Sequence, residues 1–189
     1  MSHQEHIERI WDEHVHVAKA LHALAPEVER IVRLIARSMA GGGALLVCGN
    51  GGSAADAQHI VAELTGRFFR DRKPLRALAL HANTSSLTAI GNDYGYDEVF
   101  AREVGAHGRE GDVLLAISTS GNSPNVLRAI ETARSRGMVV VGFTGADGGK
   151  MRDLCNVCLR IPSTSTPRIQ ECHILVGHTV CQLLEEILC

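Results

Sequence analysis

The stretch Val113–Pro124 constrains the fold more than any other, because a buried strand and a hydroxyl-rich loop stand next to each other. Its first five residues, Val-Leu-Leu-Ala-Ile, form a continuous apolar run, which is typical of a parallel strand buried on both faces. Four hydroxyl side chains follow within six residues, those of Ser118, Thr119, Ser120 and Ser123. Pro124 suits the first position of a helix, with the preceding serine as N-cap. The stretch therefore predicts a strand, a loop and a helix start.

The hydroxyl-rich loop can bind a phosphate without Lys or Arg. The free N–H groups at a helix start carry partial positive charge, and a dianion can be held by amides and hydroxyls. Gly121 lets the backbone approach such a ligand closely. An ordinary capped turn is the alternative interpretation, but capping requires only one of these side chains. We therefore predict an anion-binding loop.

A second loop of the same kind lies earlier in the chain. The apolar run 44–48 is followed by Gly49-Asn50-Gly51-Gly52-Ser53 and by a helix predicted over residues 54–65. Further strands are predicted at 75–80, 138–143 and 157–161, and helices at 5–24, from 26 onward, 85–90, 97–106 and 167–188. This alternation predicts an α/β fold, a three-layer αβα sandwich around a five-stranded parallel sheet, in a single domain spanning 1–189.

The second loop also matches the dinucleotide-binding pattern G-x-G-x-x-A, at Gly49–Ala54. A dinucleotide site needs an acidic residue at the end of the next strand to bind the ribose. That strand ends instead in Leu80-His81-Ala82, which argues against nicotinamide binding. Two hydroxyl-bearing anion loops at the carboxyl ends of parallel strands favour a ligand with one phosphate and many hydroxyls, a sugar phosphate.

Composition narrows the range of partners. The net charge is −2 and the pI is about 6.5, so no basic field is available for nucleic acid and no polybasic patch for a membrane surface. The sequence contains no run of about 18 apolar residues, and its N-terminus is too polar for a signal peptide. We therefore expect a cytoplasmic protein that binds a small molecule.

Two predicted helices carry groups suited to acid–base or metal chemistry. His59 and Glu63 stand four residues apart, on one face of the helix after the glycine-rich loop. A His and a carboxylate in this arrangement can share a divalent metal or a proton-transfer task. The last helix carries Gln170, Glu171 and His178 among apolar residues. Periodicity would pair His178 with Glu171, and spacing alone does not rank Gln170 above Glu171.

Several motifs occur together in one order along the chain. They are Cys48-Gly-Asn-Gly-Gly-Ser53, Gly91-Asn-Asp-Tyr-Gly95, Ser118-Thr-Ser-Gly-Asn-Ser123, Thr144-Gly145 with Asp147-Gly-Gly149, and Arg168-Ile-Gln-Glu171. From about residue 41 to the C-terminus the sequence resembles the sugar isomerase (SIS) domain family, and within it the branch that isomerises heptose phosphates. The residues 91–93 are, by their composition, expected in a turn.

The resemblance implies a flavodoxin-like fold and conversion of sedoheptulose 7-phosphate to D-glycero-D-manno-heptose 7-phosphate through an enediol, the opening step of bacterial ADP-heptose biosynthesis. It implies one zinc ion per subunit at His59, Glu63, Gln170 and His178, and an acid–base pair formed by Glu63 and His178. It implies substrate contacts by Asn50, Gly51, Gly52, Ser53, Glu63, Asn92, Asp93, Ser118, Thr119, Ser120, Ser123 and Gln170.

The resemblance also implies a homotetramer with active sites near subunit interfaces, in which the helices of residues 1–40 pack against other subunits. Two alternatives remain open. One is a noncatalytic SIS-fold regulator that binds a protein, similar to the DnaA initiator-associating protein, although such relatives lack the acid–base residues that Glu63 and His178 provide here. The other is an isomerase of a different sugar phosphate, because a phosphate loop does not measure the length of the sugar.

Overall fold

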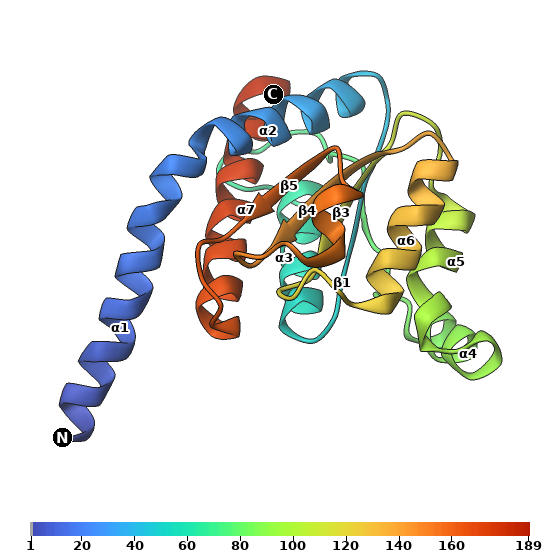
Figure 1. Ribbon diagram of the computed structural model, residues 1–189. Coiled ribbons are helices and arrows are strands. Elements are labelled where there is room, and N and C mark those ends of the chain that lie inside the picture. The colour runs from blue at the N-terminus through green and yellow to red at the C-terminus, as the bar shows by residue number, and fades with distance from the viewer. Residues whose placement is uncertain (1) are drawn as a thin grey trace.

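The computed structural model describes residues 2–189 and contains five parallel strands between two layers of helices (Figure 1). The strands are β1 (Leu45–Gly49), β2 (Ala77–Ala79), β3 (Val113–Ile117), β4 (Val139–Thr144) and β5 (Val157–Arg160), in the order β2-β1-β3-β4-β5. All neighbouring pairs are parallel. The predicted three-layer, flavodoxin-like α/β fold is confirmed.

The helices cover both faces of the sheet. One core cluster joins the sheet to α2, α3 and α7, and a second joins its other face to α5 and α6. Both faces of the central strands are buried because β1 and β3 are apolar at every position except the terminal glycine of β1. The helices are α1 (His3–Ala20), α2 (Ala25–Ala40), α3 (Gly52–Thr65), α4 (Thr84–Tyr94), α5 (Val99–His107), α6 (Pro124–Ser135) and α7 (Thr166–Leu188), with short 3-10 helices at Leu21–Leu24, Tyr96–Glu98 and Gly149–Asp153.

The two anion loops lie at the point where the chain changes direction across the sheet. β1 and β3 are hydrogen-bonded neighbours, yet α3 leaves β1 toward one face and α6 leaves β3 toward the other. The loops that begin these helices therefore lie at the switch point of the strand order, and open α/β sheets bind ligands at such a point. The fold thus places the predicted loops side by side at one edge.

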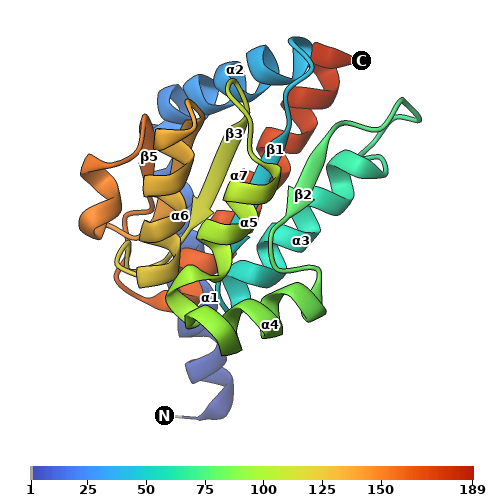
Figure 2. The ribbon, with the colours of Figure 1, turned by 90° about the vertical axis from the view of Figure 1, so that its right-hand side faces the viewer.

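The N-terminal helix α1 reaches away from the sheet, and its first residues lie far from the rest of the molecule (Figure 2). Its start is fixed by a capping box, in which Ser2 Oγ accepts a hydrogen bond from the Glu5 N–H and the Glu5 carboxylate accepts one from the Ser2 N–H. Along its length Ile7, Trp11 and Val15 are exposed. These residues repeat every four positions and so form one apolar stripe.

The strand β2 is shorter than the sequence predicts. Residues 75–80 were expected to be extended, but only Ala77–Ala79 are assigned to the sheet. The Leu75 N–H donates to the carbonyl of Leu64 at the end of α3, 3.0 Å away, and not to β1. No helix within residues 2–189 combines the length and the apolar character that crossing a membrane requires.

A buried histidine makes the fold sensitive to acid. His173 on α7 is fully buried, and its Nε2 lies 3.2 Å from the carbonyl oxygen of Thr144, to which it donates. Burial lowers the pKa of His173 to about 4, although the hydrogen bond to Thr144 opposes this shift. The unfolded chain binds this proton below about pH 6.5 and the folded chain only below about 4, so His173 destabilises the fold as the pH falls through that window.

We expect the parent protein to lose about 3 kcal/mol more unfolding free energy than the His173→Gln variant when the pH falls from 7 to 4. Urea unfolding at several pH values measures this difference. The variant lacks the titrating ring but keeps an amide that can donate to the Thr144 carbonyl. A constant difference across the pH range would contradict the assignment.

Candidate active site

The hydroxyl-rich loop after β3 is closed on itself by its own side chains. Ser118 is buried, and its Oγ lies 2.9 Å from Ser123 Oγ and 3.5 Å from Ser120 Oγ. Ser123 occupies the N-cap position of α6, as the sequence predicts, but its side chain makes no capping hydrogen bond. Its hydroxyl is therefore turned toward the other serines. In the first turn of α6, Pro124 has no N–H, and the N–H groups of Val126 and Leu127 donate to Asn125 Oδ1 and to the Ser123 carbonyl. The N–H of Asn125 is therefore the one that a ligand could use there.

This serine loop is hydrogen-bonded to the segment that follows β4. The N–H of Met151 donates to the carbonyl of Gly121 at 3.1 Å, and Asn122 accepts from the Lys150 N–H while donating to the carbonyl of Ser120. Gly121 has a φ of +65°, and a Cβ there would lie 2.1 Å from the carbonyl oxygen of Gly148. Only glycine fits such a contact. The loop thus has a fixed shape before any ligand binds.

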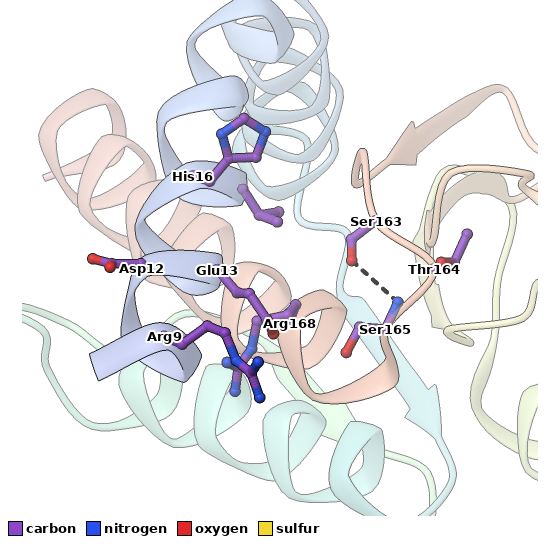
Figure 3. A pocket seen from close by; sticks show the side chains of 9 residues that line it. Arg9, Asp12, Glu13, His16, Ser163, Thr164, Ser165 and Arg168 are labelled. Carbon is purple, nitrogen blue, oxygen red and sulfur yellow. Dashed lines mark hydrogen bonds between the residues drawn. The ribbon is translucent and has the colours of Figure 1, made fainter. Parts of the chain in front are cut away.

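A cavity of about 220 Å³ opens beside the serine loop. It is lined by Thr119, Ser120, Gly145, Ala146, Asp147, Ser163, Thr164, Thr166 and Ile169. Ser163 and Thr164 also line a second cavity, of about 440 Å³, whose opposite wall is α1 (Figure 3). In that view Arg9 and His16 come from α1, and Arg168 comes from the start of α7. The N-terminal helix therefore borders the region next to the serine loop.

A pair of asparagines joins the two anion loops. Asn50 follows β1 and Asn125 lies in the first turn of α6, and each side-chain amide donates to the other's oxygen at 2.9 Å. The Tyr96 hydroxyl also donates to Asn50 Oδ1, at 3.1 Å. Of the other residues in the glycine-rich loop, Ser53 is buried and Gly51 and Gly52 are exposed. The loop after β1 is thereby held in register with the loop after β3.

Asn92 and Asp93 lie in the last turn of α4, so the expectation of a turn at 91–93 is wrong. α4 continues to Tyr94 and ends before Gly95, whose φ is +91°. Both side chains are exposed, and Asn92 Nδ2 donates to Asp93 Oδ1 at 2.8 Å. The residue types favour a turn, but the helical hydrogen bonds continue until a glycine with positive φ ends them.

Three predicted site residues meet between α3 and α7. His59 Nε2 lies 3.0 Å from Glu63 Oε1 and 3.4 Å from His178 Nε2, and one ligand atom from each of the three falls within 4.8 Å of the others. The imidazole rings of His59 and His178 pack edge to face, and the Phe68 ring lies 5.7 Å from that of His178. Glu63 and His178 are half-buried, whereas His59 is exposed.

This trio of His59, Glu63 and His178 has the donor set of a zinc site. Two imidazole nitrogens and one carboxylate oxygen are common zinc ligands, and catalytic sites keep a further position open. Nε2 of His59 and Nε2 of His178 face each other at 3.4 Å, so at least one of them presents a lone pair and not a proton. A divalent cation or a shared proton would satisfy this arrangement.

The trio exists because α3 and α7 run parallel and very close. Ile60 packs against Gly177, and a Cβ at Gly177 would lie 2.8 Å from Ile60 Cδ1. The Cys181 thiol lies 3.9 Å from the carbonyl oxygen of Ile60, to which it donates. Without a side chain at position 177 the helix axes approach closely enough for side chains of the two helices to share one site.

Gln170 and Glu171 lie away from the trio. The Gln170 amide rests on Gly52, where an added Cβ would meet it at 2.7–2.8 Å. It precedes His178 by eight residues, or about 12 Å along a helix. Glu171 is turned toward α1, where it accepts from Arg168 Nη2 at 2.6 Å and contacts His14 Nδ1 at 2.8 Å. Gln170 thus faces the glycine-rich loop, and the periodicity that would pair Glu171 with His178 fails.

Asp56 is a further titratable group that the sequence analysis did not select. Burial raises the pKa of Asp56 to about 6, and the nearby His59 offsets only part of that effect. Its Oδ2 has no hydrogen-bond partner among the described residues. Asp56 precedes His59 by three residues and Glu63 by seven. That spacing places all three on one face of α3 and could have revealed it.

Comparisons with known proteins give a consistent result. The family model of the SIS domain matches residues 12–145. The phosphoheptose isomerase of Rhodospirillum rubrum is 58% identical over 165 residues, which cover 87% of this chain and 88% of the relative. That of Aliarcobacter butzleri is 52% identical over 169 residues, 89% of each chain. The solved structure of a phosphoheptose isomerase from Neisseria gonorrhoeae superposes with a TM-score of 0.93 at 43% identity, covering 98% of this chain and 100% of its own.

The close approach of α3 and α7 leads to a testable expectation. Gly177→Ala would force Ile60 to move, because the new Cβ would lie 2.8 Å from Ile60 Cδ1, and Ile60 is only 1% exposed. We expect a loss of about 1–3 kcal/mol in unfolding free energy, measured by urea unfolding. The trio should lose its geometry at the same time. A variant as stable as the parent protein would show that the helices tolerate a wider separation.

Proposed function

The chain belongs to the phosphoheptose isomerases of the SIS-domain family, and from that premise we propose how its own residues isomerise sedoheptulose 7-phosphate to D-glycero-D-manno-heptose 7-phosphate. One observation carries the proposal: Glu63 and His178, on two different helices, lie in one group whose ligand atoms are within 4.8 Å of one another. This acid–base pair lies on helices that also border the predicted phosphate loops. Such a pair can move protons between two adjacent carbons and their oxygens.

In this proposal the serine loop binds the phosphate. The hydroxyls of Ser118, Thr119, Ser120 and Ser123 and the backbone N–H of Asn125 at the start of α6 replace the water around the dianion. Asn50, Gly51, Gly52 and Ser53 contact the sugar from the loop after β1, and Gln170 contacts it from α7. Asn92 and Asp93, exposed at the end of α4, contact its hydroxyls from the remaining side. Binding energy from the phosphate thereby orients the distant carbonyl end.

The proton chemistry falls to Glu63 and His178. The Glu63 carboxylate removes a proton from C1, next to the ketose carbonyl, and an enediol forms. His178 gives a proton to the O2 oxygen and takes one from the O1 oxygen. Return of the proton from Glu63 to C2 gives the aldose. Because the reaction only moves hydrogen within one molecule, no external oxidant or reductant is needed.

We also propose that the trio of His59, Glu63 and His178 holds one zinc ion, because its two imidazoles and one carboxylate match zinc's preferred ligands. A bound divalent ion supplies polarisation of the substrate carbonyl oxygen. Gln170, the fourth residue that family resemblance assigns to the ion, rests on Gly52 in this chain.

A homotetramer with active sites near subunit interfaces is part of this proposal. The apolar stripe of Ile7, Trp11 and Val15 on α1 is open to solvent in one chain, and Trp11 is 66% exposed. Apolar side chains repeated on one helix face favour a partner helix. The helices of residues 1–40 would then form subunit contacts. We place the enzyme in the cytoplasm, because charged sugar phosphates do not cross membranes and so stay inside the cell with it.

The noncatalytic regulator is disfavoured by the same site. A protein-binding adaptor has no need for a carboxylate and two imidazoles that converge from α3 and α7, so their retention favours catalysis. An isomerase of a different sugar phosphate would use the same groups. Measuring kcat/KM for a panel of pentose, hexose and heptose phosphates distinguishes a heptose phosphate isomerase from an isomerase of another sugar phosphate.

The central expectation concerns the acid–base pair. Glu63→Gln and His178→Ala should each lower kcat for sedoheptulose 7-phosphate by about 10²–10⁴-fold, because each variant removes one of the two proton carriers. Turnover is followed by separating ketose and aldose phosphates. Glu131→Gln changes an exposed glutamate on α6 and should match the parent protein. Full turnover in either site variant would contradict the assigned roles.

The assembly proposal has its own test. Trp11→Glu places a charge in the apolar stripe and should shift the protein from a tetramer to smaller species. Light scattering coupled to size-exclusion chromatography measures the mass. A parent protein that runs as a monomer at micromolar concentration would contradict the tetramer.

A further inference from the structure

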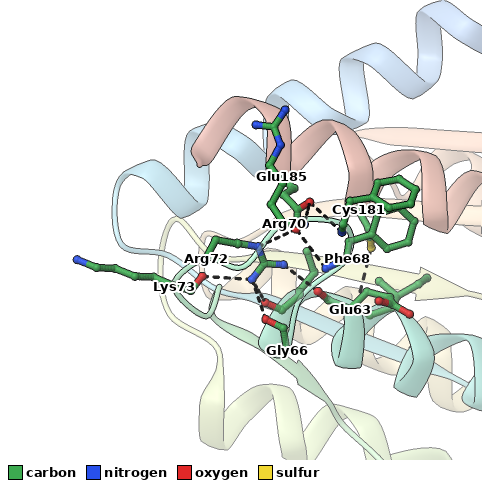
Figure 4. Close-up of polar contacts among 11 residues, drawn as sticks. Glu63, Gly66, Phe68, Arg70, Arg72, Lys73, Cys181 and Glu185 are labelled. Atoms are coloured by element: carbon green, nitrogen blue, oxygen red, sulfur yellow. Dashed lines mark hydrogen bonds and ion pairs between the residues drawn. The ribbon is translucent and has the colours of Figure 1, made fainter.

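A buried ion pair connects the end of α3 to the last turns of α7 (Figure 4). Arg72 Nε lies 3.2 Å from Glu185 Oε2, and the two side chains are only 4% and 2% exposed. Arg72 lies in the connection between α3 and β2, and Glu185 lies near the end of α7. Neither belongs to the trio or to the anion loops. Their burial and their many hydrogen bonds indicate a role separate from those two sites.

Arg72 closes the carboxyl end of α3, the helix that carries His59 and Glu63. The last four carbonyls of a helix lack partners within it. Arg72 Nη2 donates to the Glu63 carbonyl at 2.8 Å, and Nη1 donates to the carbonyls of Leu64 at 2.8 Å and Gly66 at 3.2 Å. The positive charge also complements the negative end of the helix dipole. The backbone of Glu63 is thus held directly by this guanidinium.

Glu185 binds the segment that follows α3. Its carboxylate accepts hydrogen bonds from the N–H groups of Phe68 at 3.1 Å, Phe69 at 2.9 Å and Arg70 at 2.8 Å. Burial alone would raise the pKa of Glu185, but these three N–H groups and Arg72 hold it below its usual value. The carboxylate therefore stays charged and fixes the chain just beyond Glu63.

The same network reaches His178 from two directions. Glu185 follows His178 by seven residues, two turns along α7 on the same face. Phe68, whose N–H binds Glu185, places its ring 5.7 Å from the His178 ring. One ion pair thus contacts the backbone of Glu63 and also the residue that packs on His178.

We propose that Arg72 and Glu185 are positioning residues, which set the distance between Glu63 and His178 by locking the end of α3 to α7. This inference rests on the proposed function, because it assigns the two residues to the geometry of that acid–base pair. A buried ion pair is weak evidence for stability, since its desolvation can cancel the attraction. A displacement of about 1 Å at reacting groups can cost about 100-fold in rate. The main effect of the Arg72–Glu185 pair is therefore to hold α3 and α7 in their relative positions.

The test uses two conservative variants and a matched control. Arg72→Lys keeps the charge but loses the planar fork that reaches four carbonyls, those of Glu63, Leu64, Gly66 and Lys73. Glu185→Gln keeps the shape but loses the charge. The control is Asp112→Asn. Asp112 is likewise buried and accepts from two backbone N–H groups, those of Ala44 and Arg109, just before β3. Circular dichroism first establishes that all three variants fold.

Two readouts separate positioning from plain stability. The first is the division of the effect between kcat and KM for sedoheptulose 7-phosphate. The second is the affinity of the metal-free protein for Zn²⁺, measured by competition with a chromophoric chelator. We expect Arg72→Lys and Glu185→Gln to lower kcat by at least about 10-fold, to change KM by less than about 2-fold because the serine loop is untouched, and to weaken Zn²⁺ binding by about 10-fold. Asp112→Asn should lower Tm alone.

The outcomes are distinct. Parental kcat and Zn²⁺ affinity in both variants would overturn the inference and leave the proposed function standing. A loss of kcat in Asp112→Asn as large as in the two variants would also overturn it, because stability alone would then explain the effect. If the parent protein binds Zn²⁺ but does not turn over the heptose phosphate, the proposed function fails, while weaker Zn²⁺ binding in Arg72→Lys still supports the inference. A parent protein with neither property overturns both.

Discussion

The parallel contact between α3 and α7 is the interaction on which the site depends. Gly177 lets Ile60 approach the neighbouring helix, and the same contact brings His59 and Glu63 of one helix to His178 of the other. Side chains from two separate helices can hold a fixed mutual geometry only if the backbones themselves are fixed. The buried pair of Arg72 and Glu185 lies at one end of this contact. Packing and electrostatics therefore act on the same helix pair.

The sheet supplies the second requirement, the placement of the two predicted anion loops next to that helix pair. α3 starts at the glycine-rich loop after β1 and α6 starts at the serine loop after β3, and Asn50 and Asn125 bond these loops together. Gln170 at the start of α7 rests on Gly52. The helices that carry the trio thus begin at the carboxyl edge of the sheet, where the predicted anion loops also lie.

Much of this arrangement could be predicted from the residues. The apolar run 113–117 coincides with β3, and the predicted helices 54–65 and 167–188 match α3 and α7 to within two residues. The secondary structure of long periodic segments can be predicted from the sequence, because burial of one face sets the spacing of their apolar residues. The turn expected at 91–93 is wrong because α4 continues through these residues to Tyr94, although their types favour a turn. Asp56 shares a helix face with His59 and Glu63 by its spacing, but the burial that raises its pKa depends on tertiary packing and is not visible in the sequence.

The sequence by itself determined the alternation of strands and helices, the positions of the glycine-rich and serine-rich loops and the family to which the chain belongs, because these depend on local residue patterns. Only the tertiary structure decided which groups share a site. It placed Gln170 on Gly52 and turned Glu171 toward His14 and Arg168, a choice that spacing along one helix could not make. The physical reason is that a helix fixes neighbours three and four residues apart, whereas contacts between helices depend on how both pack against the sheet.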